Sequence, residues 1–196
     1  RKDFQQILRL DDGAVYIKSS DTEIKLWADV FTPIIYIEVS SAKKTNARLS
    51  YENWRYKDRP LTKAECQQCS YKWILPKDCH TYKDTIEPEK DVLTFFHKNK
   101  EETVFDFTVN RENLDNIKDK LYNPIGGLKF GGRMHAPGFS YAGTTNGTYA
   151  STDYRAWHYD AAEIRKAIIT IDLNLDRKDK MPTAKASRSR SGRWWH

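Results

Sequence analysis

Three cysteines and a histidine form the densest group of reactive side chains in this sequence. Cys66 and Cys69 have the Cys-x-x-Cys spacing, and Cys79 directly precedes His80. Thiolate and imidazole suit zinc, but adjacent residues rarely reach one ion and no second Cys-x-x-Cys follows. A disulfide from Cys79 to one of the other two, which we assign as Cys69–Cys79, suits an oxidising compartment. Unpaired thiols are the third alternative, and we expect no metal or cofactor.

Aromatic residues beside polar ones form a second chemical pattern. It occurs in Trp54-Arg55-Tyr56 and again in residues 154–159, which include Trp157. Sugar rings stack their C–H faces on such side chains while arginine, asparagine or aspartate bind the hydroxyls. Trp54, Arg55 and Trp157 are therefore candidates for a carbohydrate surface, and packing between sheets is the alternative explanation for them.

Signatures of several enzyme classes are missing from the sequence. The pairs Gly126-Gly127 and Gly131-Gly132 lack the Gly-Lys-Ser/Thr ending of a phosphate loop and no βαβ pattern surrounds them, so we interpret them as tight turns and close backbone approach. No Gly-x-Ser-x-Gly element indicates a serine hydrolase. Acids such as Asp106 and Asp153 show no arrangement typical of a glycosidase pair. We expect no catalytic residue in this chain.

Strand-like alternation of apolar and polar residues must provide the framework. It covers residues 15–17, 24–29, 35–40 and 47–52, at a spacing typical of a meander or sandwich. We predict further strands at 92–97 and 104–109, joined as a hairpin through 98–102, and a long strand at 163–173. The prediction is an all-β fold, a two-sheet antiparallel super-sandwich of many short strands.

The remaining segments interrupt this pattern. Leu114, Ile117 and Leu121 have helical spacing, so one short helix is predicted near 111–122 and ends at Asn123-Pro124. Residues 57–90 are interpreted as an excursion between strands. The pattern fades after Lys180. We expect a β-sandwich domain over 1–180 and the start of a linker over 181–196, leading to a further domain.

Charge and hydropathy limit the partners. The net charge is +6, but four cations, Lys185, Arg188, Arg190 and Arg193, lie in the last 14 residues and leave +2 on the rest. The remaining charges are interspersed, which is typical of a solvated surface and argues against a nucleic-acid partner. No apolar run is long enough to span a membrane.

Several strings resemble the N-terminal super-sandwich domain of large bacterial glycosidases with an (α/α)₆ catalytic barrel, such as the inverting α-L-fucosidases. They are similar above all to an uncharacterised N-terminal domain family of Bacteroides-type genomes. The strings run in order along nearly the whole chain: Phe4–Gly13, Lys25–Asp29, Thr32-Pro33, Ile37-Glu38, Glu52–Arg55, Phe95–Asn99, Asn123–Ile125, Lys129–Gly132 and Trp194-Trp195. Phe95-Phe96 and Lys98 depart from the Trp-Tyr and Arg of the family pattern.

The resemblance implies a non-catalytic N-terminal domain of a multidomain glycoside hydrolase. Its partners would be a C-terminal (α/α)₆ barrel of the same chain and a complex glycan, and it would be periplasmic, at the cell surface or secreted. We expect His97, Asn99 and Arg133 at loop tips that face the barrel. The alternative function is an autonomous, lectin-like carbohydrate-binding module.

Overall fold

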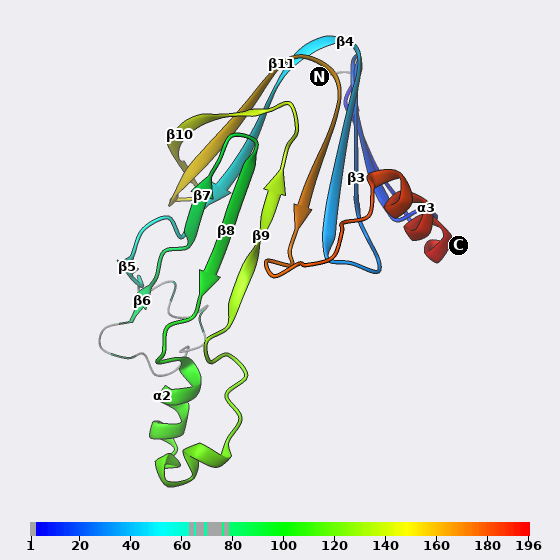
Figure 1. The fold of residues 1–196 in the computed structure, drawn as a ribbon. Helices are drawn as coiled ribbons and strands as arrows, with labels where there is room; N and C mark the ends of the chain where they lie inside the picture. Colours follow the sequence, from blue (N-terminus) through cyan, green and yellow to red (C-terminus); the bar gives the residue numbers. More distant parts are fainter. Residues whose placement is uncertain (1–2, 63–64, 66–68, 70–75, 77–78) are drawn as a thin grey trace. The chain divides into compact units, whose positions relative to one another are not determined.

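The alternating patterns become antiparallel strands over most of the chain. The computed structural model describes residues 3–62, 65, 69, 76 and 79–196. Its elements (Figure 1) are β1 (Gln5–Arg9), β2 (Ala14–Ser19), β3 (Thr22–Ala28), β4 (Ile34–Asn53), β5 (Arg59–Pro60), β6 (His80–Thr81), β7 (Thr85–Pro88), β8 (Val92–Lys98), α2 (Val104–Arg111), the 3₁₀ helix η1 (Asp115–Lys120), β9 (Lys129–His135), β10 (Ser140–Tyr149), β11 (Thr152–Asp172) and α3 (Ala184–Trp195). The predicted all-β sandwich class is confirmed.

The chain divides into two compact units. Unit 1 comprises Arg1–Asn53, Ile86–Phe95 and Gly131–His196, and unit 2 comprises Trp54–Thr85 and Phe96–Phe130. Residues 181–196, predicted as the start of a linker, therefore fall within unit 1.

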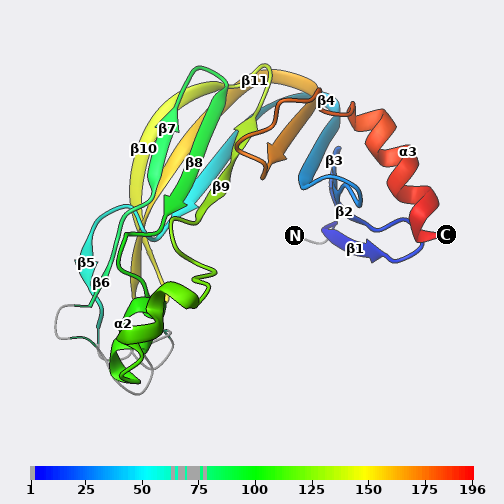
Figure 2. The same cartoon turned by 60° about the horizontal axis from the view of Figure 1, so that its bottom comes forward.

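Two long strands organise the sheet of unit 1. The hydrogen-bonded order is β1-β2-β3-β4-β11-β9-β8-β7, and β10 pairs with β11. Strand β11 pairs with β4 along most of its length, from Arg155 opposite Asn53 to Asp172 opposite Ile34. The register shifts between Ala161 and Ile164, and both strands bend (Figure 2). A bulge bends a strand, so the long strand β11 can pair with β10 near one end and with β9 near the other.

Local backbone geometry explains the tight β10–β11 hairpin. Its two loop residues, Ala150 and Ser151, both have positive φ, 48° and 69°. This is the turn geometry that matches the twist of paired strands. At the bulge, Glu163 also has a positive φ of 53°, and its N–H donates to Asn46 Oδ1 at 3.1 Å. This hydrogen bond satisfies the Glu163 N–H, which has no partner in the β4–β11 hydrogen-bond ladder at the bulge.

Aromatic residues fill one part of the unit 1 core. The Tyr51 ring stacks on Phe95 with centroids 4.6 Å apart and lies 6.3 Å from the Trp157 ring. Tyr159 is fully buried, and its hydroxyl donates to the carbonyl of Val92 at 2.6 Å. Burial raises the pKa of Tyr159 to about 12, so this donor keeps its proton across the physiological range.

Helix α3 covers a second part of the core. Ala14, Trp27, Ile34 and Tyr36 form a buried cluster there, against which Ala184 packs. The small side chains Ser187 and Ser191 are completely buried and allow a close approach of the helix, which lies along β2 and β3 (Figures 1 and 2).

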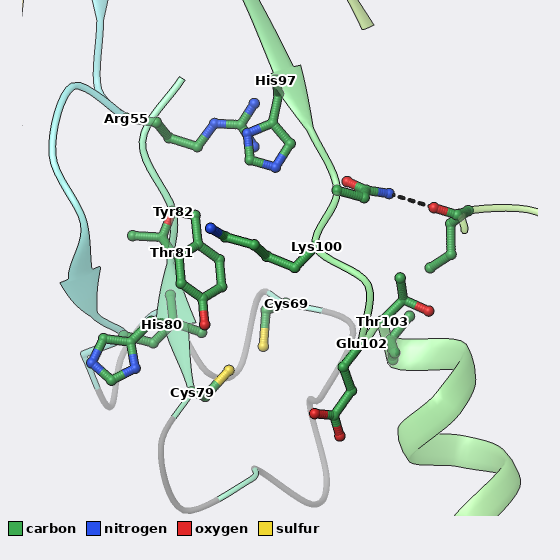
Figure 3. A pocket seen from close by; sticks show the side chains of 14 residues that line it. Arg55, Cys69, Cys79, His80, Thr81, Tyr82, His97, Lys100, Glu102 and Thr103 are labelled. Atoms are coloured by element: carbon green, nitrogen blue, oxygen red, sulfur yellow. Dashed lines mark hydrogen bonds between the residues drawn. The ribbon is translucent and has the colours of Figure 1, made fainter. Parts of the chain in front are cut away.

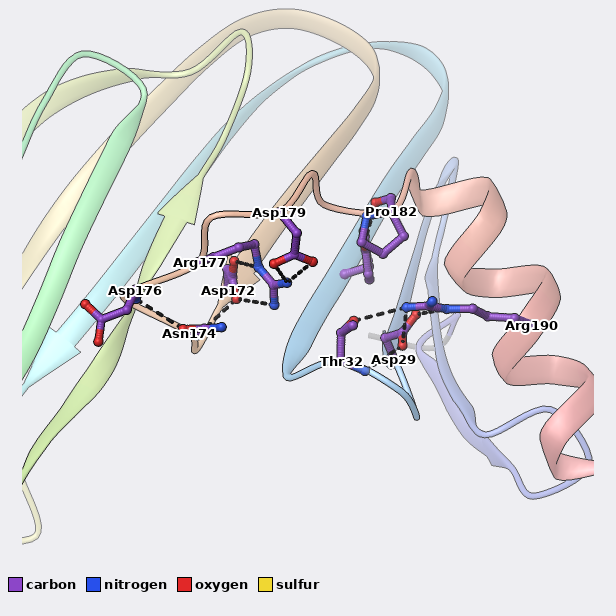
Figure 4. Close-up of polar contacts among 10 residues, drawn as sticks. Asp29, Thr32, Asp172, Asn174, Asp176, Arg177, Asp179, Pro182 and Arg190 are labelled. Atoms are coloured by element: carbon purple, nitrogen blue, oxygen red, sulfur yellow. Dashed lines mark hydrogen bonds and ion pairs between the residues drawn. The ribbon is translucent and has the colours of Figure 1, made fainter.

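Ion pairs then fix helix α3 to the strands. Arg188 pairs with Asp12, and Arg190 binds both carboxylate oxygens of Asp29 at 2.8 and 2.6 Å (Figure 4). Thr183 caps the helix by accepting from the Ala186 N–H at 3.2 Å. The arginine-rich helix α3 is thus held both by ion pairs and by packing against the apolar cluster.

The prediction for residues 98–122 was wrong in part. Residues 104–109, expected as a strand paired with 92–97, are helix α2, and β8 lies between β9 and β7 in the sheet order. The reason is a capping box, in which Thr103 and Asp106 bond reciprocally and satisfy the first N–H groups of a helix. The helix predicted near 111–122 is only the short η1.

Two other boundaries also differ from expectation. The predicted strands at 35–40 and 47–52 are parts of one strand, β4, which continues because β11 pairs with it throughout. Gly131-Gly132, interpreted as a tight turn or a close backbone approach, lies within β9, where a Cβ at Gly132 would lie 2.8 Å from the carbonyl oxygen of Asp172. Gly147 lies in β10 because the Tyr154 ring of β11 occupies the space that a side chain would need.

Candidate functional site

Unit 2 contains a pocket of about 350 Å³ where several of its elements end. The β6 strand and the residue after it contribute His80, Thr81 and Tyr82, and the end of β8 contributes His97 (Figure 3). The loop from β8 to α2 adds Asn99, Lys100, Glu102 and Thr103. The pocket is therefore built from segments that are distant in sequence, which is typical of a binding site.

A carboxylate fixes two of the basic side chains. Asp84 Oδ1 lies 2.8 Å from His97 Nδ1 and 3.1 Å from Arg55 Nε. The side chains of Asp84 and His97 are only 10% and 11% exposed, so water screens this contact weakly. The Phe130 ring lies 5.4 Å from the His97 ring and 5.6 Å from the Arg55 guanidinium, which further restricts both groups.

The opposite side of the pocket rests on backbone hydrogen bonds. The Asn99 N–H donates to Leu128 O, and its side-chain amide donates to Ile125 O, both at 2.9 Å. Beneath it, Thr103 starts α2 and donates to Asp106. The Lys118 ammonium, 2.7 Å away, and the Thr103 groups hold the pKa of the Asp106 carboxyl well below its usual range. The N-terminus of α2, which lines the pocket with Thr103 and Val104, is thus held in place by these bonds.

This arrangement presents hydrogen-bonding groups around an aromatic surface. Because the Asp84 carboxylate accepts the hydrogen bond from His97 Nδ1–H, the matching neutral tautomer has Nε2 as its acceptor. The Tyr82 ring is 39% exposed, and the Lys100 ammonium lies 4.7 Å from its centroid. Such groups can bind a polar ligand that also has an apolar face.

The structure brings three of the predicted site residues together. Arg55, His97 and Asn99 all line the pocket, although two of them were expected from a resemblance and one from an aromatic pattern. His97 and Asn99 do lie where β8 ends, at the start of the loop to α2.

The other predicted residues lie elsewhere. Trp54 belongs to unit 2 and is 38% exposed, but it is not a lining residue. Arg133 belongs to unit 1, where its Nε donates to Thr94 Oγ1 at 3.4 Å. Trp157 is 8% exposed in the unit 1 core, which is the packing role considered as its alternative.

Sequence reasoning missed Tyr82, Asp84, Lys100 and Glu102. The first two fall in the segment interpreted as an excursion, and the last two in the expected hairpin loop. One signal was available, since Thr103 and Asp106 have capping-box spacing and mark a helix start beside the loop. The hydrogen bond between Asp84 and His97 has no local signature.

Two cysteines also line the pocket. Cys69 and Cys79 are half-buried, and their sulfur atoms point toward one another in Figure 3. Cys66 lies outside the described residues. Within the described part of the chain, no group of three His, Cys, Asp or Glu side chains is arranged to hold a metal ion.

We predict that Cys69 and Cys79 form a disulfide when the protein is produced in an oxidising compartment. Closing so short a loop stabilises a fold by about 2–3 kcal/mol, so Cys79→Ser should lower the unfolding free energy of unit 2 accordingly. Alkylation before and after reduction, followed by peptide mapping, identifies the pair. Cys66→Ser is the control and should change little. Alkylation of Cys79 without reductant would contradict the prediction.

Comparison with known proteins assigns the chain to a family. The family model described as a domain of unknown function (DUF5703), in its N-terminal part, matches residues 1–196, the entire sequence. No curated protein matches the sequence. No helix among the described residues is long and apolar enough to cross a membrane. The chain belongs to this uncharacterised N-terminal domain family and has a β-sandwich fold.

Proposed function

We propose that the chain is the non-catalytic β-sandwich domain of a multidomain, exported glycoside hydrolase, and that the unit 2 pocket binds part of its glycan substrate. The observation that carries the proposal is the half-exposed Tyr82 ring beside the polar groups of His97 and Asn99. A pyranose ring needs both kinds of contact, an apolar surface for its C–H face and fixed partners for its hydroxyls.

The distribution of acids supports a binding role. Glycoside hydrolysis uses two carboxyl groups that flank the scissile bond. Among the described lining residues, Glu102 is the one carboxylic acid. We therefore assign substrate binding to this chain and bond cleavage to a partner domain, for which the sequence resemblance suggests an (α/α)₆ barrel.

Glycan binding by the 196-residue chain tests the proposal. An array of plant, microbial and host glycans, followed by calorimetry on the hits, should give binding without release of reducing sugar. Tyr82→Ala should weaken binding about tenfold, because it removes the apolar contact, whereas Tyr82→Phe should retain most of it.

Tyr149→Ala is the matched control for this test. Tyr149 is 72% exposed on unit 1, so its loss should leave glycan affinity unchanged. Binding that survives Tyr82→Ala would contradict the assignment of the pocket. Turnover by the wild-type chain would show that the domain is itself an enzyme.

A further inference from the structure

A second hollow, of about 400 Å³, adjoins the pocket within unit 2. The two share Tyr82, Asn99 and Lys100 as lining residues, so a chain-like ligand can extend from one to the other. Lys83 and Lys98 line only the second hollow. All three lysines are exposed.

These three lysines, Lys83, Lys98 and Lys100, have no ion-pair partner among the described residues. Two acids, Asp58 and Glu101, also line the hollow, and Asp58 Oδ1 accepts the backbone N–H of Lys83 at 2.7 Å. Three lysines and two acids therefore line this hollow, and the lysine side chains keep their hydrogen-bond donors.

The aromatic ring lies next to this positive charge. The Lys100 Nζ is 4.7 Å from the Tyr82 centroid, and Figure 3 shows the two side chains together at the pocket. An ammonium beside an aromatic ring is attracted by the ring and keeps N–H donors for a second partner. In the adjoining pocket, Arg55 is held by Asp84 and Glu102 provides one negative charge.

From this arrangement we infer that the ligand is an acidic saccharide, whose sugar ring contacts Tyr82 and whose carboxylate or sulfate groups contact Lys83, Lys98 and Lys100. The inference rests on the proposed function, because a neutral glycan would gain little from the three lysines. Exposed ammonium groups attract an anion from solution and set the ionic-strength dependence of binding.

Matched acidic and neutral saccharides test the inference. Calorimetry on the 196-residue chain would compare oligogalacturonate with its methyl ester, and a sulfated, uronate-free galactan oligosaccharide with its desulfated form. One acidic member should bind at least about tenfold more tightly than its neutral counterpart, and raising NaCl from about 20 to about 500 mM should reduce that difference. The two pairs distinguish carboxylate from sulfate recognition.

Single substitutions locate the site. Lys83→Gln, Lys98→Gln and Lys100→Gln should each weaken binding of the acidic saccharide about three- to fivefold. Lys83→Gln and Lys98→Gln, which line only the second hollow, should leave binding of the neutral form unchanged. Lys57→Gln is the matched control, because Lys57 lies 5.3 Å from the Tyr56 ring but lines neither hollow. It should change neither affinity.

Each contrary result has a distinct meaning. Equal affinity for acidic and neutral forms would overturn the inference while leaving the proposed function intact. No binding to any saccharide would overturn both. Acidic binding that is insensitive to the three lysine variants would place the site elsewhere, and equally tight binding of a single-stranded oligonucleotide would exclude a saccharide-specific surface.

Discussion

Asp29→Ala is expected to lower the free energy of unfolding by about 3–5 kcal/mol, because it leaves a partly buried arginine without its carboxylate. The Asp29 side chain is completely buried and accepts two hydrogen bonds from Arg190 (Figure 4). It also accepts one each from the N–H groups of Phe31 and Thr32. The substitution therefore removes the partners of several donors at once. Urea unfolding followed by tryptophan fluorescence measures the effect.

An exposed ion pair in the same unit provides the control. Arg9 and Asp11 lie 2.6 Å apart, but each side chain is 51% exposed, so water and salt screen the attraction. Asp11→Ala should change the unfolding midpoint little. If Asp29→Ala has an effect as small as that of Asp11→Ala, the contact between α3 and the strands does not hold the helix in place.

The same carboxylate predicts a pH dependence. Burial alone would raise the pKa of Asp29, but hydrogen bonds from Ser187, Arg190 and the Phe31 N–H outweigh it and lower that pKa below its ordinary value. A lowered pKa in the folded state stabilises the protein above the pKa of the unfolded chain, about 4, and this contribution disappears as pH falls through the folded value.

Thermal unfolding of the wild type and Asp29→Asn between about pH 7 and pH 3 measures this contribution. The difference in Tm should be largest at neutral pH and should shrink below about pH 4. Other carboxylates with lowered pKa values titrate in both proteins, so their effects cancel in the comparison. A difference in Tm that stays constant across this range would contradict the prediction.

Trp27→Ala is the second large effect, with an expected loss of about 3–5 kcal/mol in unfolding free energy. The indole is 2% exposed and stacks on Tyr36 with centroids 5.1 Å apart and an angle of 9° between the rings. Its Nε1–H donates to Ser187 Oγ of α3 at 3.1 Å. Truncation creates a cavity and removes the surface on which the helix packs.

Trp194→Ala is the matched control, since that indole is 57% exposed on the same helix. It should have a much smaller effect. Ser187→Ala should cost less than Trp27→Ala, about 1–3 kcal/mol, because it removes the acceptor of the buried indole N–H and a hydrogen bond to Asp29 but creates no large cavity. Circular dichroism of Trp27→Ala and Ser187→Ala would show whether either substitution unfolds α3. Equal losses for Trp27→Ala and Trp194→Ala would contradict the packing described.

Local sequence determined the class of the fold. Alternation with a period of two is a property of neighbouring residues, so the stretches 24–28 and 35–39 were recognisable as strands, and they form β3 and part of β4. The same holds for residues 163–173, of which all but the last are in β11. An all-β fold follows from these patterns without knowledge of any distant contact.

Tertiary contacts determined which faces are buried. Trp27 and Tyr36 stand opposite the aliphatic side of their strands, yet they are nearly inaccessible because α3 covers them. The helix itself has no apolar stripe to predict it. It is held by Arg188 and Arg190, whose partners Asp12 and Asp29 lie about 160 to 176 positions away in the sequence.

The candidate site illustrates the same division. The aromatic pattern in the sequence identified Arg55 and Trp157, and the family resemblance suggested His97, Asn99 and Arg133 as residues that face a barrel; of these, Trp157 and Arg133 belong to unit 1. Residue type and spacing alone determined the strands and the aromatic candidates. Only the folded chain decided which side chains share a pocket, because a contact such as that of Asp84 with His97 depends on the paths of both segments through space and not on either local pattern.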